Sequence, residues 1–178
     1  MKEKLLLHTC CAICTSKLIE ELQTNFEVIG HFYNPNIEPP GEYWKRVEAI
    51  KELSNHCQFQ LILDNYDNSM WHEEVAGLEH WAEGGKRCWH CYELRLEATA
   101  YKAQTMDIPN FSTTLTVSRY KNANIINQQG NRIGEKFRVK FVELVKGEED
   151  KKKYNYELAK KLNLYRQKYC GCVYAAQI

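Results

Sequence analysis

The chain has 178 residues, eight cysteines and a formal net charge of +1 at pH 7. This length is typical of one domain that buries a real hydrophobic core, and no apolar run reaches the length of a membrane span. The near-neutral charge gives no general sign of a nucleic-acid binder, although a local basic patch remains compatible with one. The N-terminus lacks the pattern of a secretion signal, so we expect a cytoplasmic protein whose cysteines serve metal or redox chemistry.

The first half of the chain alternates predicted strands and helices. In chain order it predicts a strand at 4–8, a helix at 12–24, a strand at 26–33, a proline-rich loop, a helix at 42–56 and a strand at 59–63. The first strand is apolar and ends beside Cys10 and Cys11. The first helix is indicated by Leu18, Ile19 and Leu22, which recur at helical spacing.

The second half continues the alternation after a break at Gly84 and Gly85. The predicted elements are helices at 70–81 and 88–106, a strand at 110–114, a loop at 116–118, a helix at 120–131, a strand at 137–145 and a charged helix at 148–162. A tail at 164–178 carries the last cysteines. The pattern predicts a single α/β domain over 1–178, with a mostly parallel sheet of about five strands flanked by helices.

The carboxyl ends of parallel strands share one edge of a sheet, where ligands bind in open α/β folds. That edge is expected to gather the polar and thiol residues that follow the strands, namely Cys10, Cys11, Asn34, Asp64, Asp67, Thr113 and Thr114.

Three cysteine pairs carry the clearest chemical signal. Cys88 and Cys91 have the two-residue spacing of a metal or redox pair on the first turn of a helix. Cys10 and Cys11 are adjacent, which is unusual for zinc ligands. Together with Cys88 and Cys91 they make a set of four thiols that favours an iron–sulfur cluster over zinc. The third pair, Cys170-Gly171-Cys172, fits a redox-active dithiol or the ligands of a second metal. Cys14 reads as a spare thiol near the site, and Cys57 as a small buried residue.

Other side chains have two interpretations each. Asp64 and Asp67 suit a hard metal or proton transfer, with helix capping as the alternative. His8 suits proton transfer at the site or a core position at a strand end. Thr113 and Thr114 suit phosphate or ribose binding or simply strand formation. The basic residues of the C-terminal third suit RNA contact or a solvated face: Lys151–153, Lys160, Lys161, Arg166 and Lys168.

Taken together, the motifs resemble the QueH family of epoxyqueuosine reductases. The matching stretches span nearly the whole chain: His8-Thr9-Cys10-Cys11-Ala12-Ile13-Cys14, Tyr33-Asn34-Pro35-Asn36-Ile37, Tyr66-Asp67, Glu83-Gly84-Gly85-Lys86-Arg87-Cys88-Trp89-His90-Cys91-Tyr92, Phe111-Ser112-Thr113-Thr114-Leu115 and Leu164-Tyr165-Arg166-Gln167-Lys168-Tyr169-Cys170-Gly171-Cys172. Ile13 and Arg119 stand where the family usually has proline. These departures affect loop shape and none of the thiols.

The resemblance implies reduction of the epoxide of epoxyqueuosine, at the wobble position of tRNA, to give queuosine. It also implies an adenine-nucleotide-hydrolase-like (HUP) fold and a [4Fe–4S] cluster held by Cys10, Cys11, Cys88 and Cys91. A second mononuclear iron would be bound by Cys170, Cys172 and Asp67, or the two tail thiols would form a redox pair. Catalytic roles fall on Cys170, Cys172, Asp67 and His8.

The implied partners are tRNA carrying epoxyqueuosine and an external electron donor resembling ferredoxin or flavodoxin, with no membrane. The expected substrate-binding residues are Tyr33, Asn34, Asn36, Arg46, Thr113, Thr114 and Arg166. Three rivals are a zinc-stabilised tRNA-binding module without redox activity, an ATP-dependent tRNA thiolase or ligase of the same superfamily, and a plain dithiol oxidoreductase that uses Cys170 and Cys172. The dithiol oxidoreductase leaves the other two cysteine pairs unexplained. The thiolase is disfavoured because Thr9-Cys10-Cys11-Ala12 stands where a glycine-rich phosphate loop is needed.

Overall fold

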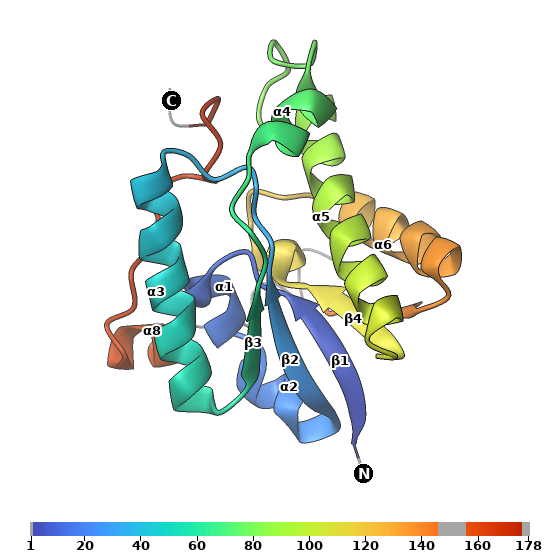
Figure 1. Ribbon diagram of the computed structural model, residues 1–178. Coiled ribbons are helices and arrows are strands. Elements are labelled where there is room, and N and C mark those ends of the chain that lie inside the picture. The colour runs from blue at the N-terminus through green and yellow to red at the C-terminus, as the bar shows by residue number, and fades with distance from the viewer. Residues whose placement is uncertain (1, 146–155, 176–178) are drawn as a thin grey trace.

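The computed structural model describes residues 2–145 and 156–175. Five strands form one sheet in the order β3-β2-β1-β4-β5, and every neighbouring pair is parallel. The strands are β1 (Glu3–His8), β2 (Phe26–Phe32), β3 (Gln60–Leu63), β4 (Asn110–Thr113) and β5 (Lys140–Phe141). The expected α/β class and five-stranded parallel sheet are therefore confirmed (Figure 1).

Helices cover both faces of this sheet (Figure 1). They are α1 (Ala12–Ser16), α2 (Ile19–Asn25), α3 (Pro40–Cys57), α4 (Ser69–Val75), α5 (Lys86–Thr105), the 3₁₀ helix η1 (Thr114–Val117), α6 (Ala123–Phe137) and α8 (Glu157–Lys161). None of the helices in the described ranges has both the length and the apolar character needed to cross a bilayer.

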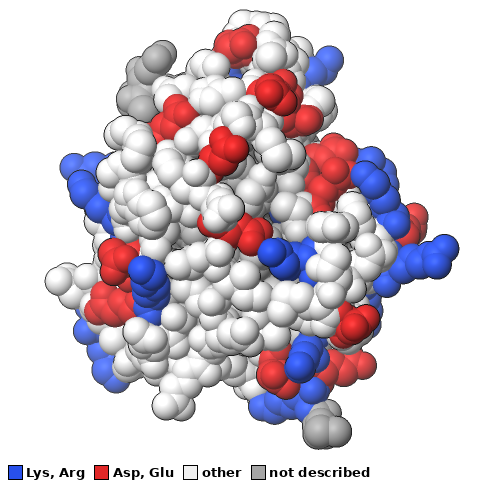
Figure 2. Space-filling view, viewed as in Figure 1, with Lys and Arg blue, Asp and Glu red and all other residues white. Residues whose placement is uncertain are grey.

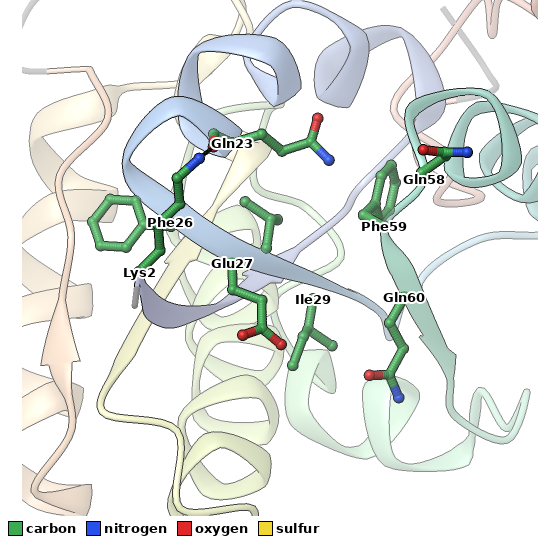
Figure 3. A pocket seen from close by; sticks show the side chains of 9 residues that line it. Lys2, Gln23, Phe26, Glu27, Ile29, Gln58, Phe59 and Gln60 are labelled. Carbon is green, nitrogen blue, oxygen red and sulfur yellow. Dashed lines mark hydrogen bonds between the residues drawn. The ribbon is translucent and has the colours of Figure 1, made fainter.

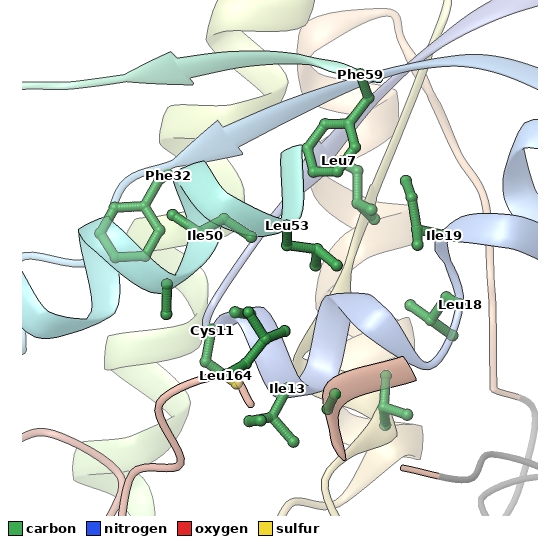
Figure 4. Packing of buried hydrophobic residues seen from close by; sticks show 14 of the residues in the cluster. Leu7, Cys11, Ile13, Leu18, Ile19, Phe32, Ile50, Leu53, Phe59 and Leu164 are labelled. Carbon is green, nitrogen blue, oxygen red and sulfur yellow. The ribbon is translucent and has the colours of Figure 1, made fainter. Parts of the chain in front are cut away.

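The central strand β1 divides the core between the two faces. Leu5 and Leu7 pack among residues of α1, α2 and α3, whereas Leu6 packs against α5 and α6. This division follows from the two-residue period of a strand, and all three leucines are fully buried. Figure 4 shows Leu7 between Phe59 and Leu53 of α3, and Ile50 and Cys11 belong to the same apolar cluster.

Some predicted boundaries are wrong for local reasons. The helix predicted at 12–24 is broken between α1 and α2. Just before the break, the Thr15 and Ser16 hydroxyls donate hydrogen bonds to the backbone carbonyls of Cys11 and Ile13, and such bonds compete with regular helical geometry. The helix expected at 70–81 ends at Val75, and the loop expected at 116–118 is largely the turn η1. Most of the helix predicted at 148–162 lies outside the described residues.

The largest error concerns the last strand. The helix predicted at 120–131 is α6, which continues to Phe137, so β5 contains only Lys140 and Phe141 rather than residues 137–145. Arg138 ends α6 in the left-handed region, with φ 56°. The helix approaches β5 closely, because a Cβ at Gly134 would lie 2.7 Å from the Val139 carbonyl oxygen.

The amino-terminal edge of the sheet has a shallow groove of about 520 Å³ beside the starts of β2 and β3. Figure 3 shows Gln23, Glu27 and Gln60 around it. The described residues that line this groove include no cysteine or histidine. Apart from Cys57, the thiols lie instead at the opposite, carboxyl-terminal edge, which is the edge predicted to carry the site.

Candidate functional site

Three thiols meet where β1 passes into α1. The sulfur atoms of Cys10, Cys11 and Cys14 all lie within 4.8 Å of one another, and those of Cys10 and Cys11 are 3.9 Å apart. Cys11 caps α1, because its sulfur accepts a hydrogen bond from the Cys14 backbone nitrogen at 3.2 Å. The loop therefore turns three free thiols toward one point, an arrangement suited to metal ligation.

The electrostatics of this group favour one thiolate among the three thiols. Hydrogen bonds from Cys11 and Cys14 hold the pKa of Cys10 well below its usual value. Thr114 adds to this, because its hydroxyl donates to the Cys10 sulfur at 3.2 Å. The shared hydrogen bond with Cys10 raises the pKa of Cys11 to about 12. Cys10 is thus the thiol most ready to bind a metal, since the thiolate is the ligating form.

The other two cysteine pairs form a second thiol group. Cys91 of α5 and Cys172 of the tail belong to one buried cluster, and Cys170 packs against it. Burial raises the pKa of Cys172 to about 11, with further contributions from the nearby thiols of Cys170, Cys91 and Cys88. Cys88 lies in the first turn of α5, and its sulfur accepts from the Gly84 backbone nitrogen at 3.3 Å. The fold therefore brings the tail pair to the helix pair.

The two thiol groups face a common cavity of about 940 Å³. Cys10, Cys14 and Cys170 contribute to its wall, and Arg95 lies among the thiols. Burial alone would lower the pKa of Arg95, but the thiols of Cys91, Cys170 and Cys10 raise it. One buried guanidinium thus interacts with cysteines from three separate segments, which explains how the fold gathers them at one place.

Basic side chains surround this cavity. They are Lys17, Arg46, Arg95, Arg119, Lys121, Arg166 and Lys168, whereas Glu83 is the one acidic residue among the described lining residues. Burial would lower the pKa of Lys121, but the nearby Cys170 and Cys10 raise it. The face shown in Figure 2 instead mixes both signs of charge around a broad uncharged area. The local charge at the cavity is therefore much more positive than the net charge of the chain.

Arg46 lines the cavity, and its guanidinium donors are used within the fold, so substrate binding by Arg46 stays a prediction. Its Nη1 and Nη2 donate to the carbonyl oxygens of Cys170 and Tyr169, at 2.9 and 3.0 Å. Its Nε donates to Glu42 at 2.8 Å. This buried arginine of α3 therefore holds the cysteine-bearing tail. Gly171 fits beneath it with φ +119°, where a Cβ would lie 2.9 Å from Ile37.

His8 lies at the end of β1 with both ring nitrogens in contact with neighbouring strands. Nδ1 is 2.8 Å from the Thr113 hydroxyl, and Nε2 is 3.1 Å from the Tyr33 carbonyl oxygen. Burial lowers the pKa of His8 to about 3, so the ring is neutral at ordinary pH. This geometry favours a role in joining the strand ends, and proton transfer by His8 stays a prediction.

The threonines and Tyr33 also organise the strand ends. The Thr113 hydroxyl accepts from the Leu115 backbone nitrogen at 3.1 Å, and the Thr114 hydroxyl accepts from the Cys10 backbone nitrogen at 3.0 Å. The Tyr33 ring stacks on His31 at a centroid distance of 6.3 Å. The Thr114 contact holds the thiol loop in place, and substrate binding by these three residues stays a prediction.

The two aspartates have separate positions. Asp64 accepts from His31 Nε2 at 2.8 Å and from Lys102 Nζ at 2.9 Å, so it ties β3 to β2 and α5. Asp67 is exposed, and its Oδ1 accepts from the Ser69 backbone nitrogen at 2.9 Å at the start of α4. Asp67 is not among the described residues that line the cavity. Its geometry therefore favours the capping interpretation over the second metal.

The remaining expected residues do reach the cavity. Asn34, Asn36 and Arg166 all contribute to its wall. Cys14, expected as a spare thiol near the site, also lines the cavity, and two further lining residues, Arg95 and Lys121, were not identified as functional from the sequence. A signal for Arg95 was present, because it follows Cys91 by four residues and so shares its face of α5.

With this geometry in place, comparison with known proteins assigns the family. The family model "Epoxyqueuosine reductase QueH" matches residues 5–177. The chain belongs to the QueH family. The epoxyqueuosine reductase QueH of Haemophilus influenzae is 36% identical over 97% of this chain and 71% of its own length. That of Thermotoga maritima is 37% identical over 96% of this chain and 88% of its own length. The resemblance in the sequence motifs is therefore confirmed.

A solved structure supports the fold of this QueH family member. The U34-tRNA thiolase NcsA from Methanococcus maripaludis, solved with its [4Fe-4S] cluster, superimposes with a TM-score of 0.57. The match covers 98% of this chain and 61% of that chain, at 13% sequence identity. At this identity the likeness concerns the fold.

Proposed function

We propose that this chain reduces the epoxide of epoxyqueuosine in tRNA to the alkene of queuosine. Membership of the QueH family supports the reaction and the tRNA substrate. One observation in the structure carries the proposal: cysteines from separate segments converge on a cavity with a cationic wall. Cys57 does not belong to this group of cysteines. It lies at the end of α3, where its carbonyl oxygen accepts a hydrogen bond from the Gln23 side chain of α2.

The thiols fit an iron–sulfur cofactor. Three sulfur atoms within 4.8 Å of one another form a donor set of the kind that Fe–S clusters take. We propose a [4Fe–4S] cluster bound by Cys10, Cys11, Cys88 and Cys91, and the position of Cys14 makes it a competing ligand. Bound there, the cluster would supply electrons received from an external donor. The cationic rim of the cavity would hold the tRNA backbone, and its interior would hold the modified nucleoside.

The tail thiols Cys170 and Cys172 have a separate proposed role. They would act as a redox pair or bind a second iron beside the cluster. Asp67 gives the second iron little support, because it is exposed, lies outside the described lining of the cavity and accepts a hydrogen bond from the Ser69 backbone nitrogen. The redox pair is favoured for two reasons. Only Gly171 separates the two cysteines, and Arg46 of α3 holds the tail backbone at Tyr169 and Cys170 next to the cavity.

The test is an anaerobic preparation of the full chain. We expect a brown protein that contains iron and sulfide and converts epoxyqueuosine-containing tRNA to queuosine with dithionite as reductant. A colourless protein that binds zinc and gives no turnover would overturn the proposal and support the tRNA-binding module.

Three single variants would then assign the ligands. Cys88→Ala is expected to lose most of the iron and the visible absorption, because a proposed ligand is removed. Cys57→Ala serves as the matched control and is expected to keep both. Cys14→Ala is expected to retain the cluster. Loss of iron in Cys14→Ala together with full iron in Cys88→Ala would move the cluster onto the three thiols at the end of β1.

A further inference from the structure

Two almost fully buried side chains on the cavity wall, Asn36 and Arg95, have hydrogen-bonding groups without a partner among the described residues, and the half-buried Gln167 there has an unpaired Oε1. Asn36 is 1% exposed, and neither its amide nitrogen nor its amide oxygen has a partner among the described residues. Arg95 is 2% exposed, and its Nη2 has no partner within the same part of the chain. Both residues line the cavity that holds the thiols. Because a buried polar group without a partner costs about 1–3 kcal/mol, such groups in a cavity point to a bound ligand.

The rest of the Arg95 guanidinium is fixed by the fold. Nε donates to the Cys91 carbonyl oxygen at 3.0 Å, and Nη1 is 3.4 Å from Asn34 Oδ1. Asn34 is itself held, because its Nδ2 donates to the Thr9 carbonyl oxygen at 3.0 Å. Asn34 therefore orients Arg95 rather than leaving its own amide for substrate. Nη2 remains as a buried, preorganised donor on the cavity wall.

The chemistry of the two groups restricts the ligand. A guanidinium only donates hydrogen bonds and stays protonated in proteins, so Arg95 requires an oxygen or another acceptor. An amide both donates and accepts, so Asn36 suits the same oxygen or a neighbouring hydroxyl. Cys10 and Cys170 line the same cavity, which places this polar pair beside the redox groups. The ligand is therefore an oxygen-bearing group positioned for reduction.

We propose that Arg95 and Asn36 bind the epoxide oxygen of the substrate and stabilise the charge that it acquires as its bonds to carbon break. This inference rests on the proposed reductase function. In the overall reaction two C–O bonds break, one C=C bond forms, and the oxygen leaves as water after taking up two protons. The two electrons come from the external reductant. Arg95 gives no proton, because its role is to donate a hydrogen bond that strengthens as negative charge develops.

The first test is Asn36→Leu, compared with wild-type enzyme reconstituted with iron and sulfide. Leucine has a similar size and needs no hydrogen bonds, so the variant is expected to be as stable as the wild type or more stable. We expect kcat/KM to fall at least tenfold while the iron content is unchanged. Arg95→Lys keeps the charge and loses the fork of donors, and is expected to lower kcat/KM about 100-fold, as removal of one oxyanion donor does.

A binding measurement separates this role from one in holding the cofactor. Without reductant, the wild type is expected to bind tRNA with epoxyqueuosine at least tenfold more tightly than tRNA with queuosine, which lacks the epoxide oxygen. Both variants are expected to lose this preference. Asn127→Leu is the matched control, because Asn127 is a buried asparagine whose Nδ2 donates to the Val145 carbonyl oxygen at 2.8 Å. It should lose stability and keep the preference.

Three results would overturn the inference. The first is that Asn36→Leu and Arg95→Lys keep both the binding preference and the turnover within twofold of the wild type. The second is loss of iron in parallel with activity, which would place the two side chains at the cofactor instead. The third is a wild type that makes queuosine without preferring the epoxide form. A wild type without turnover would reject the reductase function itself. If Arg95→Lys does not fold, Asn36→Leu and its control decide the question alone.

Discussion

Asp64 is the carboxylate whose protonation we expect to limit stability in acid. The hydrogen bond from His31, followed by that from Lys102, lowers its pKa from 3.8 to about 2. A depressed pKa in the folded state adds stability above the unfolded value, and this is lost as pH falls through the folded value. The contribution is about 2–3 kcal/mol at neutral pH and disappears between about pH 5 and pH 2.

The measurement compares Asp64→Asn with the wild type by urea denaturation at several pH values. The variant is expected to be less stable at pH 7, and the gap should close toward pH 2, because both proteins share all other titrating groups. Two stability curves that stay parallel over this range would show that the Asp64 contacts with His31 and Lys102 do not depend on its charge.

Single residues differed in how far the sequence could predict them. Cys10 and Cys11 were identifiable because adjacent thiols at the end of an apolar strand have few other uses. Arg46 and Asn34 line the cavity, where Arg46 contacts the tail carbonyls and Asn34 contacts Arg95, and substrate binding by these two residues stays a prediction. Hydrogen bonds between residues more than 60 positions apart depend on how the elements pack, which no local pattern records.

At the scale of elements, strand and helix types were predictable and their ends were not. The buried run of β1 and the apolar spacing of α3 and α5 are strong local signals. The break after α1 and the late end of α6 depend on side-chain hydroxyls and on a left-handed residue at Arg138. These helix ends depend on the positions of a few atoms, so the apolar spacing of the sequence does not predict them.

The contact between α3 and the tail leads to a prediction about Arg46. Arg46→Lys replaces a guanidinium, which donates to Glu42 and to the backbone carbonyls of Cys170 and Tyr169, by a single ammonium group. We expect the free energy of unfolding to fall by about 1–3 kcal/mol, or roughly 2–4 °C in Tm per kcal/mol. Cys170 and Cys172 should also react faster with a thiol reagent, because their segment is released.

The matched control is Lys51→Met on the same helix. Lys51 pairs with Glu48 at 2.9 Å, and both side chains are exposed. Such pairs contribute less than about 1 kcal/mol, so little change in Tm or thiol reactivity is expected. Equal thiol reactivity in Arg46→Lys and Lys51→Met would show that the arginine does not hold the tail.

At the scale of the whole molecule, the sequence predicted the site edge and the resemblance to QueH, and the comparisons confirmed the family. It did not predict how the thiols divide. Cys14 joins Cys10 and Cys11, while Cys88 and Cys91 lie with the tail pair. The division depends on how α5 and the tail pack against the loop after β1, and the spacing of cysteines along the chain carries no information about that packing.

The cations around the cavity predict a salt-dependent interaction with tRNA. A protein that neutralises phosphates releases counterions, so affinity falls as salt rises, with a slope of about 0.7–0.9 per phosphate contact. Arg166 and Lys168 are exposed and line the cavity. Replacing both by glutamine should weaken binding and reduce the slope of log affinity against log salt by up to about 1.4–1.8.

The matched control replaces Arg132 and Lys136 of α6 by glutamine. These cations pair with Glu93 and Glu97, at 2.6 Å in each case, and do not belong to the described lining of the cavity. The control removes the same charge, so it tests whether position or net charge governs binding. Titrations of tRNA at several salt concentrations should give the wild-type slope for the control and a smaller one for the cavity variant. Equal reductions in both would place the tRNA backbone elsewhere on the molecule.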